Sequence, residues 1–351
     1  IFATFLVQPY FPKKRLLGKI IIMSFSKVFI FIFLTLFSFL TIFAQNEDDP
    51  INIPTSIVTL NIGVVDGRGQ PIINLNKDDF AVYEDGVKQT ISRFEPTVAP
   101  FSVVMILDMS GSTLGFRETI RQSAFRFLDA LAPDDRVAVI EFYDKVNLRN
   151  DFTTNRKILA NSISVANGRG KTQLYKALTM AMQKLAGEGK RRKAIIVLTD
   201  GVDSTARDKD RDLLQKVSEK EILNSIKPET SDILNRVLNQ ADAQGVTIYP
   251  LALPTGDPKK LADPSPIQIA MFEAARNRLQ ILAQRSGGTL NTINRLEEMG
   301  RLYAAVAANL RTLYTVEYQP INDKRDGNFR FIKVEVRNPD LIAKTREGYV
   351  A

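Results

Sequence analysis

The sequence predicts an α/β protein in which a doubly wound, mostly parallel sheet is inserted into a discontinuous β-sandwich. In the middle of the chain, continuous apolar runs such as SVVMILD (102–108) alternate with helical patterns, as expected of a parallel sheet buried on both faces. Strand patterns with alternating polarity flank this region on both sides. Neither flanking piece has enough strands to close a core alone, so we expect the two to share one sandwich.

The first flanking piece covers residues 57–98. Apolar and polar residues alternate from Val58 to Val64, which predicts a half-buried strand, and the turn signal DGRGQ follows. Two further strand-like segments, 80–83 and 87–91, are separated by the hairpin signal Glu-Asp-Gly. This piece is therefore predicted to be the first part of the sandwich.

The inserted domain is predicted to cover residues 99–311. Its strands are buried apolar runs, and its helices show one apolar face. The predicted strands are 102–108, 136–142, 193–200 and 246–253, with a short one near Leu290. The predicted helices are 120–131, 174–185 and 267–288.

Residues 203–244 depart from this pattern, because they are highly charged and mixed in sign. Such charge runs are usually solvated, so we expect a charged helical insertion. The alternative is a lid that binds a partner. Strand patterns return in residues 312–351, at 315–320 and in the alternating segment 332–337, which predicts the second part of the sandwich.

Residues 1–44 are predicted to be an upstream and signal segment, with Met23 as the start. Lys27 precedes an uncharged run of 17 residues, and an acidic, polar stretch follows, which is the pattern of a secretory signal. We expect cleavage before Gln45, a linker over 45–56, and export to the periplasm, the outer surface or the medium. The alternative is an uncleaved segment that anchors the protein in the inner membrane.

Composition narrows the possible functions. The 351 residues include no cysteine and no histidine, which removes thiol nucleophiles, the commonest general base and the commonest transition-metal ligand. Without the five basic residues of the N-terminal segment, the net charge of +8 becomes 42 basic against 39 acidic residues. These charges are mixed along the chain, so we predict no nucleic-acid binding.

The stretch NGRGKTQLYKAL (167–178) contains Gly-Lys-Thr, which also ends the phosphate-binding loop of nucleotide-binding proteins. That loop needs a further glycine five residues before Gly170, and position 165 is valine. We therefore predict no nucleotide site. Thr172 is instead expected to supply a hydroxyl at the start of a helix.

Polar side chains follow two of the buried strands at their carboxyl ends. Asp108 opens an Asp-x-Ser-x-Ser motif with Ser110 and Ser112, and Asp200 ends the strand IIVLT. Because ligands of open parallel sheets bind at this edge, we expect these four residues and Thr172 to meet. Oxygen ligands without nitrogen or sulfur indicate a hard cation, Mg²⁺ or Mn²⁺. With only two charged ligands, the ion would still attract a carboxylate from another protein.

Four other polar residues near these loops have simpler interpretations. Asp203 is expected to cap the next helix, and Lys171 to be a solvated residue at the rim. Asp134 and Asp135 precede a strand and are expected to form a turn.

With these five oxygen ligands the chain resembles a von Willebrand factor type A domain with a metal-ion-dependent adhesion site. All five motif positions match: Asp108, Ser110, Ser112, Thr172 and Asp200. The flanks NLNKDDFAVYEDGVKQTISRF and FRFIKVEVRNPDLIAKTREGY resemble those of secreted bacterial proteins related to von Willebrand factor A. The resemblance covers about residues 57–349 and departs at 203–244. It implies a Rossmann-like sheet of about six strands and metal-dependent protein recognition.

We therefore predict a secreted or envelope module for adhesion or scaffolding, which recognises a partner's Asp or Glu carboxylate through the metal, and not an enzyme. Contact with a membrane is expected only through an uncleaved signal segment. Two alternatives stay open, a metal-assisted phosphohydrolase and a structural envelope protein with a vestigial metal site. Aspartyl-phosphate enzymes usually need a second carboxylate two residues after the nucleophile, and position 110 is serine.

Overall fold

The computed structural model describes residues 57–257, 262–293 and 296–351. The predicted signal segment, its cleavage before Gln45 and the linker to residue 56 lie outside the described residues. Residues 55–351 form one compact unit. Within the described ranges, no helix combines the length and the apolar character that crossing a membrane requires.

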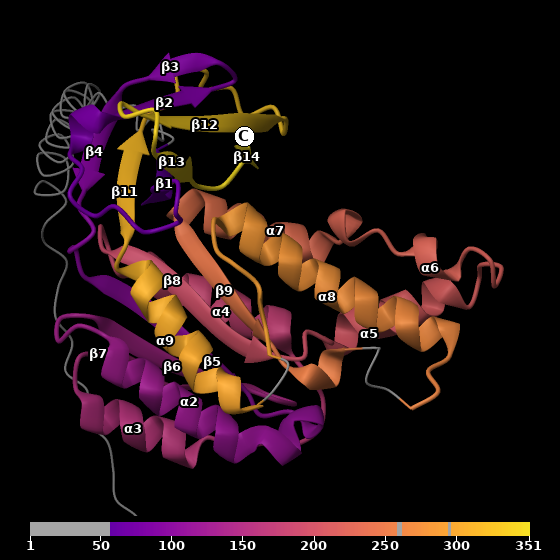
Figure 1. The fold of residues 1–351 in the computed structure, drawn as a ribbon. Helices are drawn as coiled ribbons and strands as arrows, with labels where there is room; N and C mark the ends of the chain where they lie inside the picture. Colours follow the sequence, from indigo (N-terminus) through magenta and orange to yellow (C-terminus); the bar gives the residue numbers. More distant parts are fainter. Residues whose placement is uncertain (1–56, 258–261, 294–295) are drawn as a thin grey trace, which may run out of the picture. The chain divides into compact units, whose positions relative to one another are not determined.

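A six-stranded sheet with the order β10-β9-β8-β5-β6-β7 forms the centre of this unit (Figure 1). Its strands are β5 (Phe101–Asp108), β6 (Arg136–Phe142), β7 (Val146–Thr153), β8 (Arg192–Thr199), β9 (Val246–Ala252) and β10 (Asn291–Thr292). Neighbouring strands are parallel except for β7, which pairs antiparallel with β6. The strands that follow β5 in the chain, β6 and β7, lie on one side of it, whereas the later strands β8, β9 and β10 lie on the other side. The strand order therefore reverses beside β5.

Helices cover both faces of this sheet (Figure 1). On one face lie α2 (Arg117–Ala130), α3 (Arg156–Val165) and α9 (Met299–Leu310), and on the other α4 (Leu174–Ala186), α7 (Asp232–Gln244) and α8 (Pro266–Ser286). Along β5, Met105 packs with the first group and Ile106 with the second. Burial on both faces explains the continuous apolar runs, and the predicted α/β fold with a mostly parallel sheet is confirmed.

The stretch 203–244 is helical, but its last helix is not the solvated insertion that the charge pattern suggested. It contains α5 (Ser204–Leu214), α6 (Ile222–Ser225) and α7. In α7 one apolar face is buried against the sheet, and this face consists of Leu234, Val237, Leu238 and Ala241. These residues recur at helical spacing, and the charges of the preceding segments obscured that pattern.

Two four-stranded antiparallel sheets take strands from both ends of the described chain. Their orders are β13-β1-β11-β4 and β14-β12-β2-β3. The strands are β1 (Val58–Val65), β2 (Phe80–Glu84), β3 (Val87–Gln89), β4 (Ile91–Glu95), β11 (Leu313–Tyr318), β12 (Phe329–Val336), β13 (Ile342–Lys344) and β14 (Gly348–Val350). Leu60, Val82 and Tyr318 belong to one buried cluster that both sheets share. We call these two sheets the two-sheet unit.

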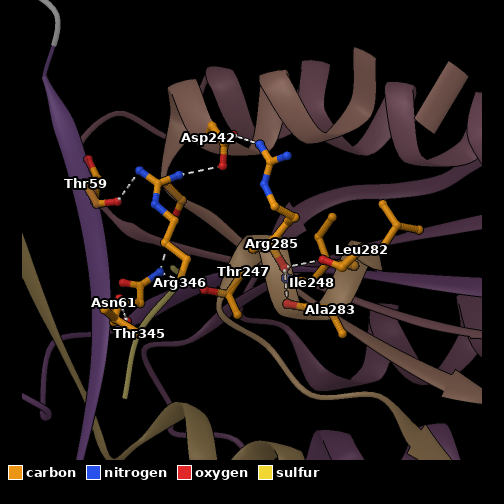
Figure 2. Close-up of polar contacts among 12 residues, drawn as sticks. Thr59, Asn61, Asp242, Thr247, Ile248, Leu282, Ala283, Arg285, Thr345 and Arg346 are labelled. Carbon is orange, nitrogen blue, oxygen red and sulfur yellow. Dashed lines mark hydrogen bonds and ion pairs between the residues drawn. The ribbon is translucent and has the colours of Figure 1, made fainter. Parts of the chain in front are cut away.

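A buried ionic network joins the two-sheet unit to the central domain (Figure 2). Arg346 donates to Asp242 Oδ1 at 2.7 Å and to the carbonyl oxygen of Thr59 at 3.1 Å. Arg285, near the end of α8, donates to Asp242 Oδ2 at 2.8 Å. Asp242 lies near the end of α7, just before β9 begins, so this junction is at the amino ends of the parallel strands.

Candidate metal centre

The sheet register brings the two predicted carboxylates to the same edge. Leu107 of β5 pairs with Leu198 of β8, so the next residues, Asp108 and Thr199, lie beside each other. The Thr199 hydroxyl donates to Asp108 Oδ2 at 2.7 Å. Asp200 follows directly, at the point where the strand order reverses. This is the edge at which open parallel sheets bind ligands.

The Asp-x-Ser-x-Ser loop folds back over the end of β5. The backbone N–H of Ser110 donates to Asp108 Oδ1 at 3.0 Å, which fixes the carboxylate from a second direction. The hydroxyl oxygens of Ser110 and Ser112 are 3.2 Å apart. The motif therefore places two hydroxyl oxygens next to each other, just after the end of β5.

A second loop brings Thr172 to the same place. The N–H of Gly111 donates to the carbonyl of Gly170 at 3.0 Å, and Gly170 has φ +94°. A Cβ at Gly170 would lie 2.3 Å from Asp144 Oδ2, so a larger residue would push the loop away. The N–H of Thr172 donates to Ser204 Oγ at 3.0 Å. Ser112, Thr172 and Asp200 line one cleft.

The electrostatics of the two carboxylates favour a cation. Burial, and after it the neighbouring Asp200 carboxylate, raise the pKa of Asp108 to about 7, although hydrogen bonds from Ser110 and Thr199 oppose this shift. Burial likewise raises the pKa of Asp200. Among the described residues, neither carboxylate has an ion-pair partner. Two buried like charges at one edge need a neutralising ion or a proton.

The donor set fits a hard divalent cation. Two carboxylates and three hydroxyls are all oxygen ligands, as Mg²⁺ and Mn²⁺ prefer. Across the described residues, no group of three or more Asp, Glu, His or Cys could hold a metal ion. A centre at this edge would therefore need hydroxyl oxygens, and the hydroxyls of Ser110, Ser112 and Thr172 are available there.

The neighbouring residues have the structural roles that the sequence predicted. Asp203 caps α5, because its carboxylate accepts from the N–H groups of Thr205 at 2.9 Å and Ala206 at 3.1 Å. It also accepts from the N–H of Tyr175 at 3.4 Å, so it ties the start of α4 to α5. Lys171 is exposed at the rim. Asp135 is a turn residue whose carboxylate accepts backbone N–H groups at 2.8 Å.

Three supporting residues were not identified from the sequence. Thr199 orients Asp108, and its only signal was a polar residue at the end of a buried strand. Asp144 holds the Gly170 loop from another part of the chain, which no local pattern indicates. Gly256 is close to Asp200, because a Cβ there would lie 2.2 Å from the Asp200 carbonyl oxygen.

Part of the chain is similar in sequence to known proteins. Residues 103–202 match the family model described as von Willebrand factor type A domain. An uncharacterized protein of Synechocystis sp. is 33% identical over 106 residues, which cover 29% of this chain and 25% of that protein. The chain thus matches about a quarter of the length of this relative.

Solved structures that the chain matches have low sequence identity to it. The vWF domain of the type V pili tip protein Mfa5 from Porphyromonas gingivalis has 17% identity and a TM-score of 0.44, covering 60% of this chain and 95% of that one. A von Willebrand factor type A protein from Catenulispora acidiphila has 15% identity and a TM-score of 0.45, covering 78% and 62%. The match over residues 103–202 includes all five predicted ligands. Over residues 103–202, the chain is therefore similar to the von Willebrand factor type A domain.

Proposed function

We propose that this protein is an adhesion or scaffold module that binds Mg²⁺ or Mn²⁺ and, through the ion, a carboxylate of a partner protein. The proposed ligands are Asp108, Ser110, Ser112, Thr172 and Asp200. One observation carries the proposal: two buried carboxylates lie beside hydroxyl groups at the carboxyl edge of the sheet, and neither has an ion-pair partner among the described residues.

The residues around the centre keep its oxygens in place. Thr199 and the Ser110 N–H hold the two oxygens of Asp108 at 2.7 and 3.0 Å, so this carboxylate is oriented before an ion binds. A bound divalent ion would supply positive charge between the carboxylates and would accept an outside carboxylate at an open position. Because three of the five ligands are neutral hydroxyls, the protein cancels the charge of the ion only through Asp108 and Asp200.

Binding is favoured over catalysis by the side chains that the fold places near this edge. The chain has no histidine or cysteine to act as base or nucleophile. The nearby carboxylate of Asp203 is occupied by N–H groups of α4 and α5. Asp144 holds the backbone of the Gly170 loop through the N–H of Lys171 at 2.7 Å. These carboxylates are structural supports in the proposed role.

We also propose that the protein acts outside the cytoplasm, in the periplasm, at the outer surface or after release. This rests on the signal pattern of residues 1–44. N-terminal sequencing of protein from an envelope fraction tests it. A chain beginning at Gln45 is expected, and a membrane-embedded form that retains Phe43 would contradict cleavage.

The metal centre is tested by calorimetric titration of Mg²⁺ and Mn²⁺ into wild type and Asp108→Asn. Wild type should bind one ion and show a higher melting temperature in its presence, because an ion that binds only the folded state stabilises it. Asp108→Asn should lose most of the affinity, Asp200→Asn less, and Thr172→Ala least, since water can replace a neutral hydroxyl. Asp134→Asn, an exposed turn residue, is the matched control.

Equal affinities and equal melting shifts in wild type and Asp108→Asn would refute the centre. The same preparations also test the alternative of a hydrolase. Sustained turnover of a generic phosphate ester with Mg²⁺, lost in Asp108→Asn and kept in Asp134→Asn, would favour the enzyme over the binding module.

A further inference from the structure

We propose that the cleft between α5 and α8 docks an acidic peptide segment of the partner that also carries an apolar side chain. This rests on the proposed function and defines the class of partner more closely. The cleft opens beside Ser112, Thr172 and Asp200 and encloses about 630 Å³. Such a volume lies within the range of roughly 300–1,000 Å³ that is typical of ligand sites.

One wall of the cleft is basic because of how the charges of α5 are distributed. Arg207 and Arg211 are four residues apart and both line the cleft. The acidic Asp210 faces α8 instead, where Arg278 binds both its oxygens at 2.6 Å. Asp208 is 3.4 and 3.8 Å from the two arginines and exposed, so it neutralises them weakly. The side of α5 facing the cleft is therefore positively charged.

The opposite wall is apolar and comes from the start of α8. Ile267, Met271 and Phe272 line the cleft there. Met271 is buried against α5 and α6, whereas Phe272 is only partly buried and belongs to none of the hydrophobic clusters among the described residues. A partly covered phenyl ring beside a charged wall offers a surface for an apolar side chain of a ligand.

Two polar atoms in this cleft are buried without a hydrogen-bond partner in the described part of the chain. They are Nε of Arg207 and Oγ1 of Thr255. Buried donors are normally paired, and an orphan donor costs free energy. A change of side-chain rotamer would be needed to bring either atom to a carboxylate or a peptide carbonyl in the cleft.

These observations together define which side chains a bound segment should carry. A partner segment with one carboxylate at the metal centre would place its next residues in the cleft. A second carboxylate would meet Arg207 and Arg211, and an apolar side chain would cover Phe272. A purely apolar segment would leave the arginines without counter-charge, and a purely acidic one would leave Phe272 uncovered.

The test uses fluorescein-labelled synthetic peptides and fluorescence anisotropy in Mg²⁺. The first peptide contains Ser-Asp-Phe-Glu-Ser, and its partner has Gln in place of Glu. Arg207→Gln and Arg211→Gln should each weaken binding of the Glu peptide about three- to fivefold, as for a partly exposed ion pair. Binding of the Gln peptide should not show this loss. Lys209→Gln is the control, because it removes the same charge from α5 but Lys209 lines a different cleft. It should leave the affinities for both peptides unchanged.

The comparison of the two peptides separates the cleft from the metal centre. Arg207 also lowers the pKa of Asp200, so its removal could weaken the ion site itself, but such a loss would affect both peptides equally. Equal losses for both peptides, or no loss beyond that of Lys209→Gln, would overturn the cleft proposal. So would failure of every peptide to bind while Mg²⁺ binds by calorimetry.

A different result would overturn the proposed function instead. Binding that persists in EDTA, or that is unchanged when Asn replaces the Asp of the peptide, would mean that the metal centre does not hold the peptide carboxylate. The expected outcome is binding that requires both Mg²⁺ and the peptide Asp and is strengthened by the peptide Glu only when both arginines are present.

Discussion

Replacing Asp242 by asparagine should destabilise the protein strongly, because this carboxylate connects the two-sheet unit to the central domain. Asp242 and Arg346 are 6% and 5% exposed, and Asp242 accepts from both Arg346 and Arg285 (Figure 2). Asparagine keeps the size but removes the negative charge and turns one acceptor into a donor. Arg346 would then be a buried cation without an anion.

The magnitude follows from burial. Breaking a buried ion pair by removing one partner costs about 3–5 kcal/mol. Two features lower the cost here: Arg346 retains its bond to the Thr59 carbonyl at 3.1 Å, and the side chain of Arg285 is 23% exposed and can be hydrated. We therefore expect a loss of about 3 kcal/mol in the free energy of unfolding, or about 6–12 °C in melting temperature.

The assay is urea unfolding followed by far-UV circular dichroism and by tyrosine fluorescence, since the chain has no tryptophan. Asp151→Asn is the control, because it removes a contact of similar length, 2.6 Å to Lys184, between side chains that are 60% and 34% exposed. Exposed pairs contribute about 0–1 kcal/mol. The reasoning is refuted if both probes give the same unfolding transition and Asp242→Asn loses no more unfolding free energy than Asp151→Asn. Burial would then not determine how strongly this junction stabilises the protein.

One further prediction concerns the same region. Gly245→Ala should cost more than Gly189→Ala in the same assay. Both glycines have positive φ, but only at Gly245 would a Cβ meet another residue, at 2.5 Å from Thr59 Cβ, so equal costs would show that backbone strain alone matters.

The carboxyl-edge residues could be predicted from the sequence because strands buried on both faces appear as uninterrupted apolar runs. The first acidic residue after such a run ends the strand or follows it closely, as Asp108 and Asp200 do. The elements that were missed lack this signal. β7 is an edge strand in which no residue is buried, and its polar sequence VNLRNDFT resembles a loop. α3 has only three buried residues in ten.

Contacts between distant parts of the chain were not predictable in the same way. Asp144 accepts a hydrogen bond from the loop that carries Thr172. Asp242 binds Arg285 and Arg346, which lie 43 and 104 residues later in the chain. No local periodicity encodes these pairs, because they depend on packing between elements. In α7 the local signal existed, yet the charged residues before it led to the wrong interpretation.

The position of the two-sheet unit has a consequence for recognition. Asn61 of β1 donates to the Gly245 carbonyl at 3.2 Å and to Thr247 Oγ1 at 2.8 Å, at the beginning of β9. β9 is parallel to β8, and β8 ends beside Asp200. Because parallel strands have their amino ends at one edge of the sheet and their carboxyl ends at the other, the junction is anchored at the edge opposite the candidate metal centre. The two-sheet unit can therefore be held rigidly by buried ion pairs and hydrogen bonds while the carboxyl edge and the α5–α8 cleft stay accessible to a partner.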